Sequence, residues 1–147
     1  MSELVSTATA AWHGGLSDGA GTVSLASGVA GPLPVSWASR TEAADGRTSP
    51  EELIGAAHAA CFSMALSHEI AGLGGTPKTL DVTAKVTFGP SPAGGNGVLS
   101  SALTVRAQAP DGDAAKLTAV AEDAKDNCPI SKALNANVAL TVEATPS

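Results

Sequence analysis

The sequence predicts an α+β fold in which antiparallel sheets surround one long, buried central helix. Three features support this fold. Short strands with glycine-containing turns come first, a helix-length apolar segment follows Ser49, and strands then alternate with a second helix. The expected order, β-β-β-α-β-β-α-β, is typical of α+β proteins. Because the chain has 147 residues, we expect a single domain that spans residues 1–147.

The first part of the chain is expected to form an antiparallel meander of three short strands. Glycine pairs and Asp-Gly or Ser-Gly steps separate the apolar runs and mark turns between them. A polar segment over residues 40–48 is expected to be a loop. The three strands are expected over residues 4–11, 21–26 and 33–39.

The central helix has clear start and stop signals. Ser49 is a suitable N-cap, Pro50 stands at the first helical position, and Glu52 completes a capping box. The helical pattern continues to about Ala71, after which glycines end it. Residues 53–66 are apolar on nearly all sides, which indicates a buried helix rather than a surface one.

The second half of the chain is expected to contain a strand pair, an amphipathic helix and a last strand. Alternation of apolar and polar residues indicates the strand pair, and apolar residues at helical spacing indicate the helix. A cysteine-proline step then interrupts this helix, and a short helical piece follows. The expected ranges are 79–88 and 98–108 for the strand pair, 113–126 for the helix and 137–144 for the last strand.

Composition excludes several classes of protein. The formal net charge is −6 and no run of Lys or Arg occurs, so we expect no nucleic-acid partner. The longest strongly apolar stretch, over residues 53–66, contains His58 and is too short to cross a bilayer, so we expect no membrane association. The N-terminus lacks the basic and apolar regions of a secretory signal, which makes the cytoplasm the expected location.

The aromatic content is low, with two Trp, two Phe and no Tyr, so small side chains must fill the core. A core of small side chains in a short chain is thin. We therefore expect a second subunit to cover apolar surface.

Two cysteines, Cys61 and Cys128, are the main candidates for chemistry. In a reducing compartment such cysteines serve more often in redox, catalytic or metal sites than as structural disulfides. One hypothesis is a peroxide-reducing dithiol, in which one thiolate becomes a sulfenic acid and the other thiol condenses with it. Cys128 precedes Pro129, so it is expected at a helix N-terminus, where backbone N–H groups favour a thiolate. Cys61 lies in an alanine-rich helix, where burial raises the pKa of a thiol, so it needs an imported positive charge.

Other interpretations of the same residues stay open from the pattern alone. Cys61 in an alanine-rich helix is also consistent with inert packing. His58, three residues earlier, allows a Cys/His hydrolase or acyltransferase, or a metal pair, although H-x-x-C without two further ligands is a weak metal signal. A packed histidine is the favoured interpretation of His58, and His13 and His68 are expected on the surface.

Two motifs together carry a resemblance to a known family. "SPEELIGAAHAACFSMALS" (49–67) and "NCPISKAL" (127–134) closely resemble the OsmC/Ohr family of organic hydroperoxide-reducing proteins. The likeness extends more weakly to residues 11–28 and to the last strand. It implies an OsmC-like, cytoplasmic, intertwined homodimer with two composite active sites at the subunit interface. It also implies a thiol peroxidase that needs no haem, flavin or metal.

Four residues match the catalytic positions of the family. By the resemblance, Cys61 is the peroxidatic cysteine and Cys128 the resolving one, while Glu51 matches the family's glutamate. Arg40 matches the arginine that precedes this helix in the OsmC branch. The Ohr branch carries its arginine in the first hairpin, which has none here. The loop between Arg40 and the helix looks one residue longer than usual and contains Arg47, so either arginine can be the catalytic one.

The resemblance implies roles for the charged pair. The arginine would stabilise the Cys61 thiolate and donate hydrogen bonds to the peroxide, while Glu51 would hold the guanidinium by a bidentate pair. Ten residues of continuous helix, or ~15 Å along its axis, separate Glu51 from Cys61. Either the helix breaks, or Arg40 and Glu51 serve the Cys61 of the other subunit. We expect at least one of the two to act in trans.

The expected function is the reduction of an organic hydroperoxide to an alcohol in oxidative or osmotic stress defence. A Cys61 sulfenic acid and then a Cys61–Cys128 disulfide would form, and a dithiol would reduce the disulfide. The resemblance suggests a dihydrolipoyl-type reductant. The alternative is a non-catalytic stress protein that binds a small apolar ligand in a cavity at the dimer interface.

Overall fold

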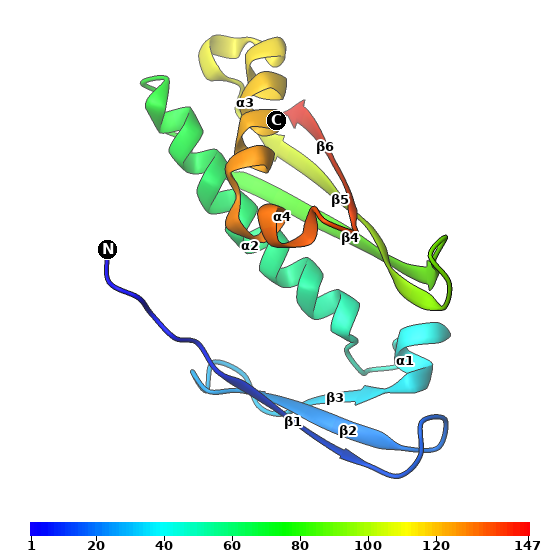
Figure 1. The fold of residues 1–147 in the computed structure, drawn as a ribbon. Coiled ribbons are helices and arrows are strands. Elements are labelled where there is room, and N and C mark those ends of the chain that lie inside the picture. The colour runs from blue at the N-terminus through cyan, green and yellow to red at the C-terminus, as the bar shows by residue number, and fades with distance from the viewer. The chain divides into compact units, whose positions relative to one another are not determined.

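The computed structural model describes all residues from Met1 to Ser147, which form two units. The N-terminal unit is Met1–Glu52 and the C-terminal unit is Leu53–Ser147. Each contains one three-stranded sheet (Figure 1). The expectation of a single domain over residues 1–147 stays a prediction. The long helix α2 (Pro50–Gly72) begins at the end of the first unit and continues into the second, within one residue of its expected end.

The N-terminal unit contains the expected antiparallel meander, in the order β1-β2-β3. Residues 4–7 lie outside the first strand, and the third strand stops at Ser36 instead of residue 39. A short helix begins there because Ser36 and Ser39 form a reciprocal capping box at its start. Arg40 therefore lies on a helix and not in the expected loop. The elements are β1 (Ala8–His13), β2 (Ala20–Leu25), β3 (Leu33–Ser36) and α1 (Trp37–Thr41).

The sheet of the C-terminal unit has the order β4-β5-β6. β4 and β5 are antiparallel as expected, but β6 pairs with β5 in parallel. This difference from an all-antiparallel arrangement has a topological cause. A helical crossover joins β5 to β6, and such a crossover returns the chain in the same direction. The elements are β4 (Leu80–Pro90), β5 (Asn96–Ala107), the 3₁₀ turn η1 (Pro110–Gly112), α3 (Ala114–Asn127), α4 (Pro129–Leu134) and β6 (Ala139–Pro146).

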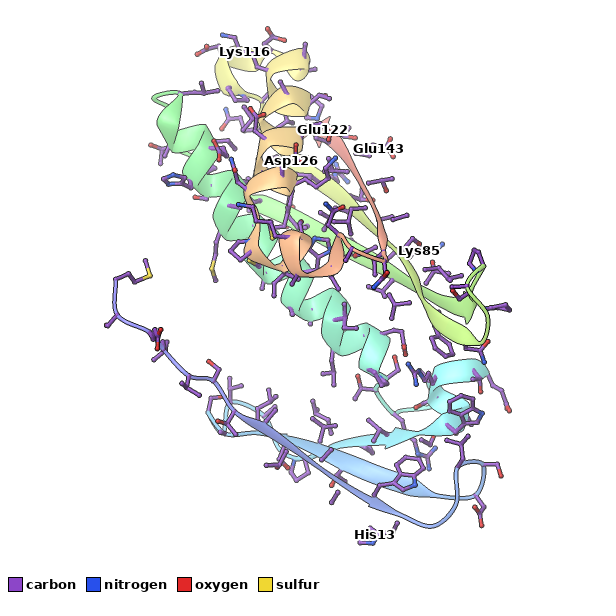
Figure 2. All side chains as sticks on the ribbon, in the orientation of Figure 1. His13, Lys85, Lys116, Glu122, Asp126 and Glu143 are labelled. Carbon is purple, nitrogen blue, oxygen red and sulfur yellow. The ribbon has the colours of Figure 1, made fainter.

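The hydrophobic core of the C-terminal unit lies between β5 and the helices α2 and α3. One face of β5 is buried, and apolar side chains from both helices join it in one cluster. α3 is amphipathic, as expected. Its charged side chains Lys116, Glu122 and Asp126 are exposed (Figure 2). The main contributors to the cluster are Phe62, Leu66 and Ile70 from α2, Leu103, Val105 and Ala107 from β5, and Leu117, Val120, Ala121 and Ala124 from α3.

Helix α2 buries one face in the single chain, although the sequence predicts burial on nearly all sides. The buried positions recur every three or four residues, which is the repeat of one helix face. On other faces Ala56, Ala57 and Ala60 are exposed, and Met64 keeps 73% of its surface. The buried positions are Glu51, Gly55, His58, Phe62, Leu66 and Ile70.

The N-terminal unit has no buried apolar side chain. Every residue of β1 is exposed, including Trp12, and the preceding Leu4 and Val5 are almost fully exposed. A sheet normally buries one apolar face against another layer. The sheet of the N-terminal unit therefore buries no apolar face within the unit itself.

Candidate active site

Arg40 and Glu51 form an ion pair within the N-terminal unit. Arg40 Nε donates to Glu51 Oε1 at 2.9 Å, and Arg40 Nη2 donates to the same oxygen at 2.7 Å. Glu51 is buried, and its second oxygen, Oε2, accepts no hydrogen bond. The guanidinium carbon of Arg40 also lies 5.9 Å from the centroid of a Trp37 ring, in cation–π range. Two guanidinium N–H groups thus donate to one carboxylate oxygen, whereas the expected bidentate pair would use both oxygens.

The other candidate arginine, Arg47, has a different environment. Its side chain is exposed and pairs with Asp45 across 3.7 Å, at a carboxylate that is itself exposed. Exposed ion pairs of this kind restrain the side chains weakly. Of the two arginines, Arg40 is the one that the structure places on Glu51.

Local signals at the start of α2 position Glu51. Ser49 Oγ accepts from the backbone N–H of Glu52 at 3.1 Å, so the expected cap is confirmed. In a full capping box the Glu52 carboxylate would accept from the backbone N–H of Ser49. Here it accepts instead from Thr48 Oγ1 at 2.6 Å. Glu51 in the first turn also benefits from the positive end of the helix dipole. The cap therefore fixes the position of Glu51 in the first turn of α2, where its carboxylate accepts hydrogen bonds from Arg40.

Cys61 and Cys128 are neighbours within the C-terminal unit, and both are free thiols. Cys61 is half-buried on α2, whereas Cys128 is fully buried and joins α3 to α4 as the C-cap of one and the N-cap of the other. Pro129 stands at the first position of α4, as expected. The resemblance implied that the two cysteines approach each other. Their spacing alone did not, since they lie on elements that are distant along the chain.

Burial raises the pKa of the Cys61 thiol above its usual value, and the adjacent Cys128 thiol raises it further. The backbone of Ile130 opposes this shift by hydrogen bonding, which lowers the pKa. None of these groups carries a positive charge. Burial therefore favours the protonated Cys61 thiol over the thiolate.

His58 is a packed histidine, as expected. It is fully buried, and its Nδ1 lies 2.7 Å from Ser101 Oγ while its Nε2 lies 2.9 Å from Ser131 Oγ. Burial lowers the pKa of His58, which favours the neutral imidazole. Both ring nitrogens are occupied by hydroxyl groups, so the Cys/His hydrolase hypothesis loses its base. His13 and His68 are exposed, as expected.

Residues 43–143 match the family model described as OsmC-like protein, which is more than half of the chain. The chain belongs to the OsmC family. It is 43% identical over 129 residues to Peroxiredoxin OsmC of Escherichia coli (strain K12), across 88% of this chain and 89% of that protein.

Solved structures of family members agree in fold. OhrB of Bacillus subtilis, an organic hydroperoxide resistance protein, is 26% identical with a TM-score of 0.76, covering 95% of this chain and 98% of that one. A putative organic hydroperoxide resistance protein of Vibrio cholerae is 28% identical with a TM-score of 0.75. That match covers 98% of this chain and 93% of the other, whose structure has captopril in one of its active sites.

In this OsmC family member, three contacts of the candidate site residues and of His58 were not predicted from the sequence. Trp37 was expected in a strand, so its approach to Arg40 was not foreseen. Ser101 and Ser131 were not recognised as partners of His58. Ser101 could have been found from the strand pattern. It occupies the same inward-facing row of β5 as Leu103 and Val105, but its side chain is polar. A polar residue in a buried row requires a hydrogen-bonding partner.

Two further observations concern metal sites and membrane-spanning helices. No three side chains of His, Cys, Asp or Glu gather closely enough to hold a metal ion. None of the helices combines the length and the apolar content that crossing a bilayer requires.

Proposed function

We propose that this chain is a thiol-dependent peroxidase that reduces organic hydroperoxides to alcohols in oxidative and osmotic stress defence. The observation that carries the proposal is the proximity of two free thiols, Cys61 and Cys128, in a chain closely related to a peroxiredoxin. Two neighbouring thiols supply both the attacking and the resolving sulfur that peroxide reduction requires.

The reaction follows from the arrangement of the thiols. The Cys61 thiolate attacks the hydroperoxide, the O–O bond breaks, and the alkoxide leaves as an alcohol after it takes a proton. The transferred hydroxyl remains on Cys61 as a sulfenic acid. The Cys128 thiol then attacks this sulfur, the S–O bond breaks, and water leaves as the disulfide forms. A dithiol reductant restores both thiols by exchange.

Arg40 is the proposed source of the positive charge that Cys61 needs. Burial opposes ionisation of Cys61, and a guanidinium close to the sulfur would favour the thiolate and the departing alkoxide. Glu51 would fix the orientation of this guanidinium through its two hydrogen bonds. The catalytic set is therefore Cys61, Cys128, Arg40 and Glu51, with Glu51 as a positioning residue.

We propose an intertwined homodimer of two OsmC-like domains, each spanning residues 1–147. Apolar side chains that their own units leave exposed, such as Leu4, Val5 and Met64, support a second copy. α2 runs unbroken from Pro50 to Gly72, so the helix break that would allow Glu51 to reach Cys61 of its own chain does not occur. Arg40 and Glu51 would then serve the Cys61 of the partner subunit.

Mixed dimers test whether Arg40 acts in trans. Protomers with Cys61→Ala and with Arg40→Ala are each expected to be nearly inactive as homodimers. After refolding together, each mixed dimer should regain one working site, because the intact Cys61 of one protomer meets the intact Arg40 of the other. Activity should be measured as hydroperoxide turnover per dimer. A mixture that stays as inactive as its components would contradict the trans arrangement.

The substrate class and the reductant form the second test. We propose that the dithiol is of the dihydrolipoyl type and that the protein works in the cytoplasm. Turnover of cumene and tert-butyl hydroperoxides should exceed turnover of hydrogen peroxide, because apolar surroundings suit an organic substituent. Dihydrolipoamide should support faster cycling than thioredoxin. Failure to reduce any of the three peroxides with either reductant would overturn the proposed function.

A further inference from the structure

A buried hydrogen bond joins the helix of Cys61 to the helix that begins at Cys128. His58 lies three residues before Cys61 on α2, and Ser131 lies three residues after Cys128 in the first turn of α4. His58 Nε2 and Ser131 Oγ are 2.9 Å apart. Ser131 is the one buried residue of α4, a helix of six residues. The buried side chain of α4 is therefore held to the rest of the unit by a hydrogen bond.

The opposite nitrogen of His58 fixes the imidazole ring. Nδ1 lies 2.7 Å from Ser101 Oγ on β5, and Ser101 is fully buried. A neutral imidazole has one donor and one acceptor nitrogen, and each serine hydroxyl can take either role. The network Ser101–His58–Ser131 is thus fully satisfied, and loss of one hydroxyl leaves a buried ring nitrogen unpaired.

Packing alone does not require this polar network. The next buried positions along the same face of α2 are filled by Phe62 and Leu66. An apolar side chain at position 58 would avoid the cost of desolvating an imidazole. The imidazole contributes directional contacts, because the hydrogen bonds at its two nitrogens fix the position of α4 relative to α2 and β5.

A second side-chain contact also links α2 to the segment that carries Cys128. Asn127, immediately before Cys128, donates from Nδ2 to Glu69 Oε1 on α2 at 2.8 Å. This hydrogen bond is exposed, so water can replace it at little cost. It provides a matched control, because it also links α2 to the Cys128 segment but lacks burial.

We propose that Ser101–His58–Ser131 is a positioning network that holds Cys128 against Cys61 and thereby sets the rate of disulfide formation. The proposal rests on the proposed function, for which the two sulfur atoms must meet after Cys61 is oxidised. None of the three residues belongs to the proposed set that attacks the hydroperoxide, which is the Cys61 thiolate with Arg40 and Glu51. The network therefore acts on the second step, in which Cys128 displaces hydroxide from the sulfenic acid and water is released.

Rapid mixing of the reduced protein with cumene hydroperoxide separates the two steps. Trapping with dimedone and intact mass measure the sulfenic acid, and loss of the second thiol measures the disulfide. In Ser131→Ala the first step should keep its rate within about twofold, whereas disulfide formation should slow by at least about tenfold because small misplacements of reacting groups are costly. Sulfenic acid should accumulate. Ser131→Thr, which keeps the hydroxyl, should restore the rate, and Asn127→Ala should match the unchanged protein.

A peroxide-free measurement separates this proposal from the proposed function. Equilibration with reduced and oxidised glutathione reports how readily Cys61 and Cys128 form a disulfide. Ser131→Ala should weaken the disulfide by about tenfold relative to the unchanged protein, because the thiols are held together less well. If the unchanged protein fails to react with cumene hydroperoxide but this difference remains, the proposed function falls and the positioning role stands.

Three results would overturn the network proposal. Disulfide formation in Ser131→Ala could match the unchanged protein, both steps could slow equally, or Ser131→Thr could fail to restore the rate. If Ser131→Ala does not fold, His58→Phe is the second variant, because phenylalanine fills the buried position with an apolar side chain of similar shape. It should likewise slow disulfide formation while the first step keeps its rate. Normal disulfide formation in a folded His58→Phe would likewise overturn the proposal.

Discussion

Replacement of Cys61 with serine is expected to abolish the reduction of cumene hydroperoxide. A serine hydroxyl stays protonated at neutral pH and forms no sulfenic acid, so the first bond-forming step is lost completely. Steady-state turnover with dihydrolipoamide as reductant measures the effect. A rate unchanged from that of the original protein would end the peroxidase proposal.

Cys128→Ser is the matched control for this variant. It keeps the attacking thiol, so it should consume one equivalent of hydroperoxide and form the Cys61 sulfenic acid. It should then fail to cycle normally, because no resolving thiol is adjacent. Equal behaviour of Cys61→Ser and Cys128→Ser in a single turnover would show that the two roles are wrongly assigned.

Arg40→Ala is expected to have the second-largest effect. Removal of one hydrogen-bond donor from a developing oxyanion lowers the rate by about 10²–10³-fold, and we expect a loss of this order for Arg40→Ala. Burial already raises the pKa of Cys61, and loss of the guanidinium should raise it further. The pH dependence of single-turnover oxidation should therefore shift to higher pH, and part of the lost rate should return as the pH rises.

Arg47→Ala is the control for Arg40→Ala. Arg47 is exposed and pairs with an exposed aspartate, so its removal should leave the rate and the pH profile unchanged. Arg40→Lys should recover only part of the activity, because a lysine keeps the charge but not the two donors that meet Glu51. A larger loss in Arg47→Ala than in Arg40→Ala would move the catalytic role to Arg47.

Local signals in the sequence were sufficient for most elements of the fold. Ser49, Pro50 and the glycines after Ala71 predict both ends of α2, because capping and helix termination depend on adjacent residues. The alternating pattern likewise predicts β4 and β5 to within a few residues. α1 was missed because its start depends on two serine side chains inside what resembles a strand. The parallel direction of β6 was missed because strand pairing is a long-range property.

The candidate site was predictable to the extent that its residues lie in sequence motifs. The resemblance predicted that Arg40 pairs with Glu51, and the two side chains are in contact in the structure. Sequence spacing alone did not distinguish Arg40 from Arg47 as the partner of Glu51. The partners of His58 were not foreseeable, because Ser101 and Ser131 are 43 and 73 residues away along the chain. Such contacts arise only when β5 and α4 fold against α2.

The count of free thiols before and after one equivalent of cumene hydroperoxide tests the central proposal most directly. Two free thiols, Cys61 and Cys128, are present in the reduced chain. Both should disappear together, and peptide mapping should identify a Cys61–Cys128 disulfide. Full retention of both thiols would contradict the account and favour a protein that only binds a small apolar ligand.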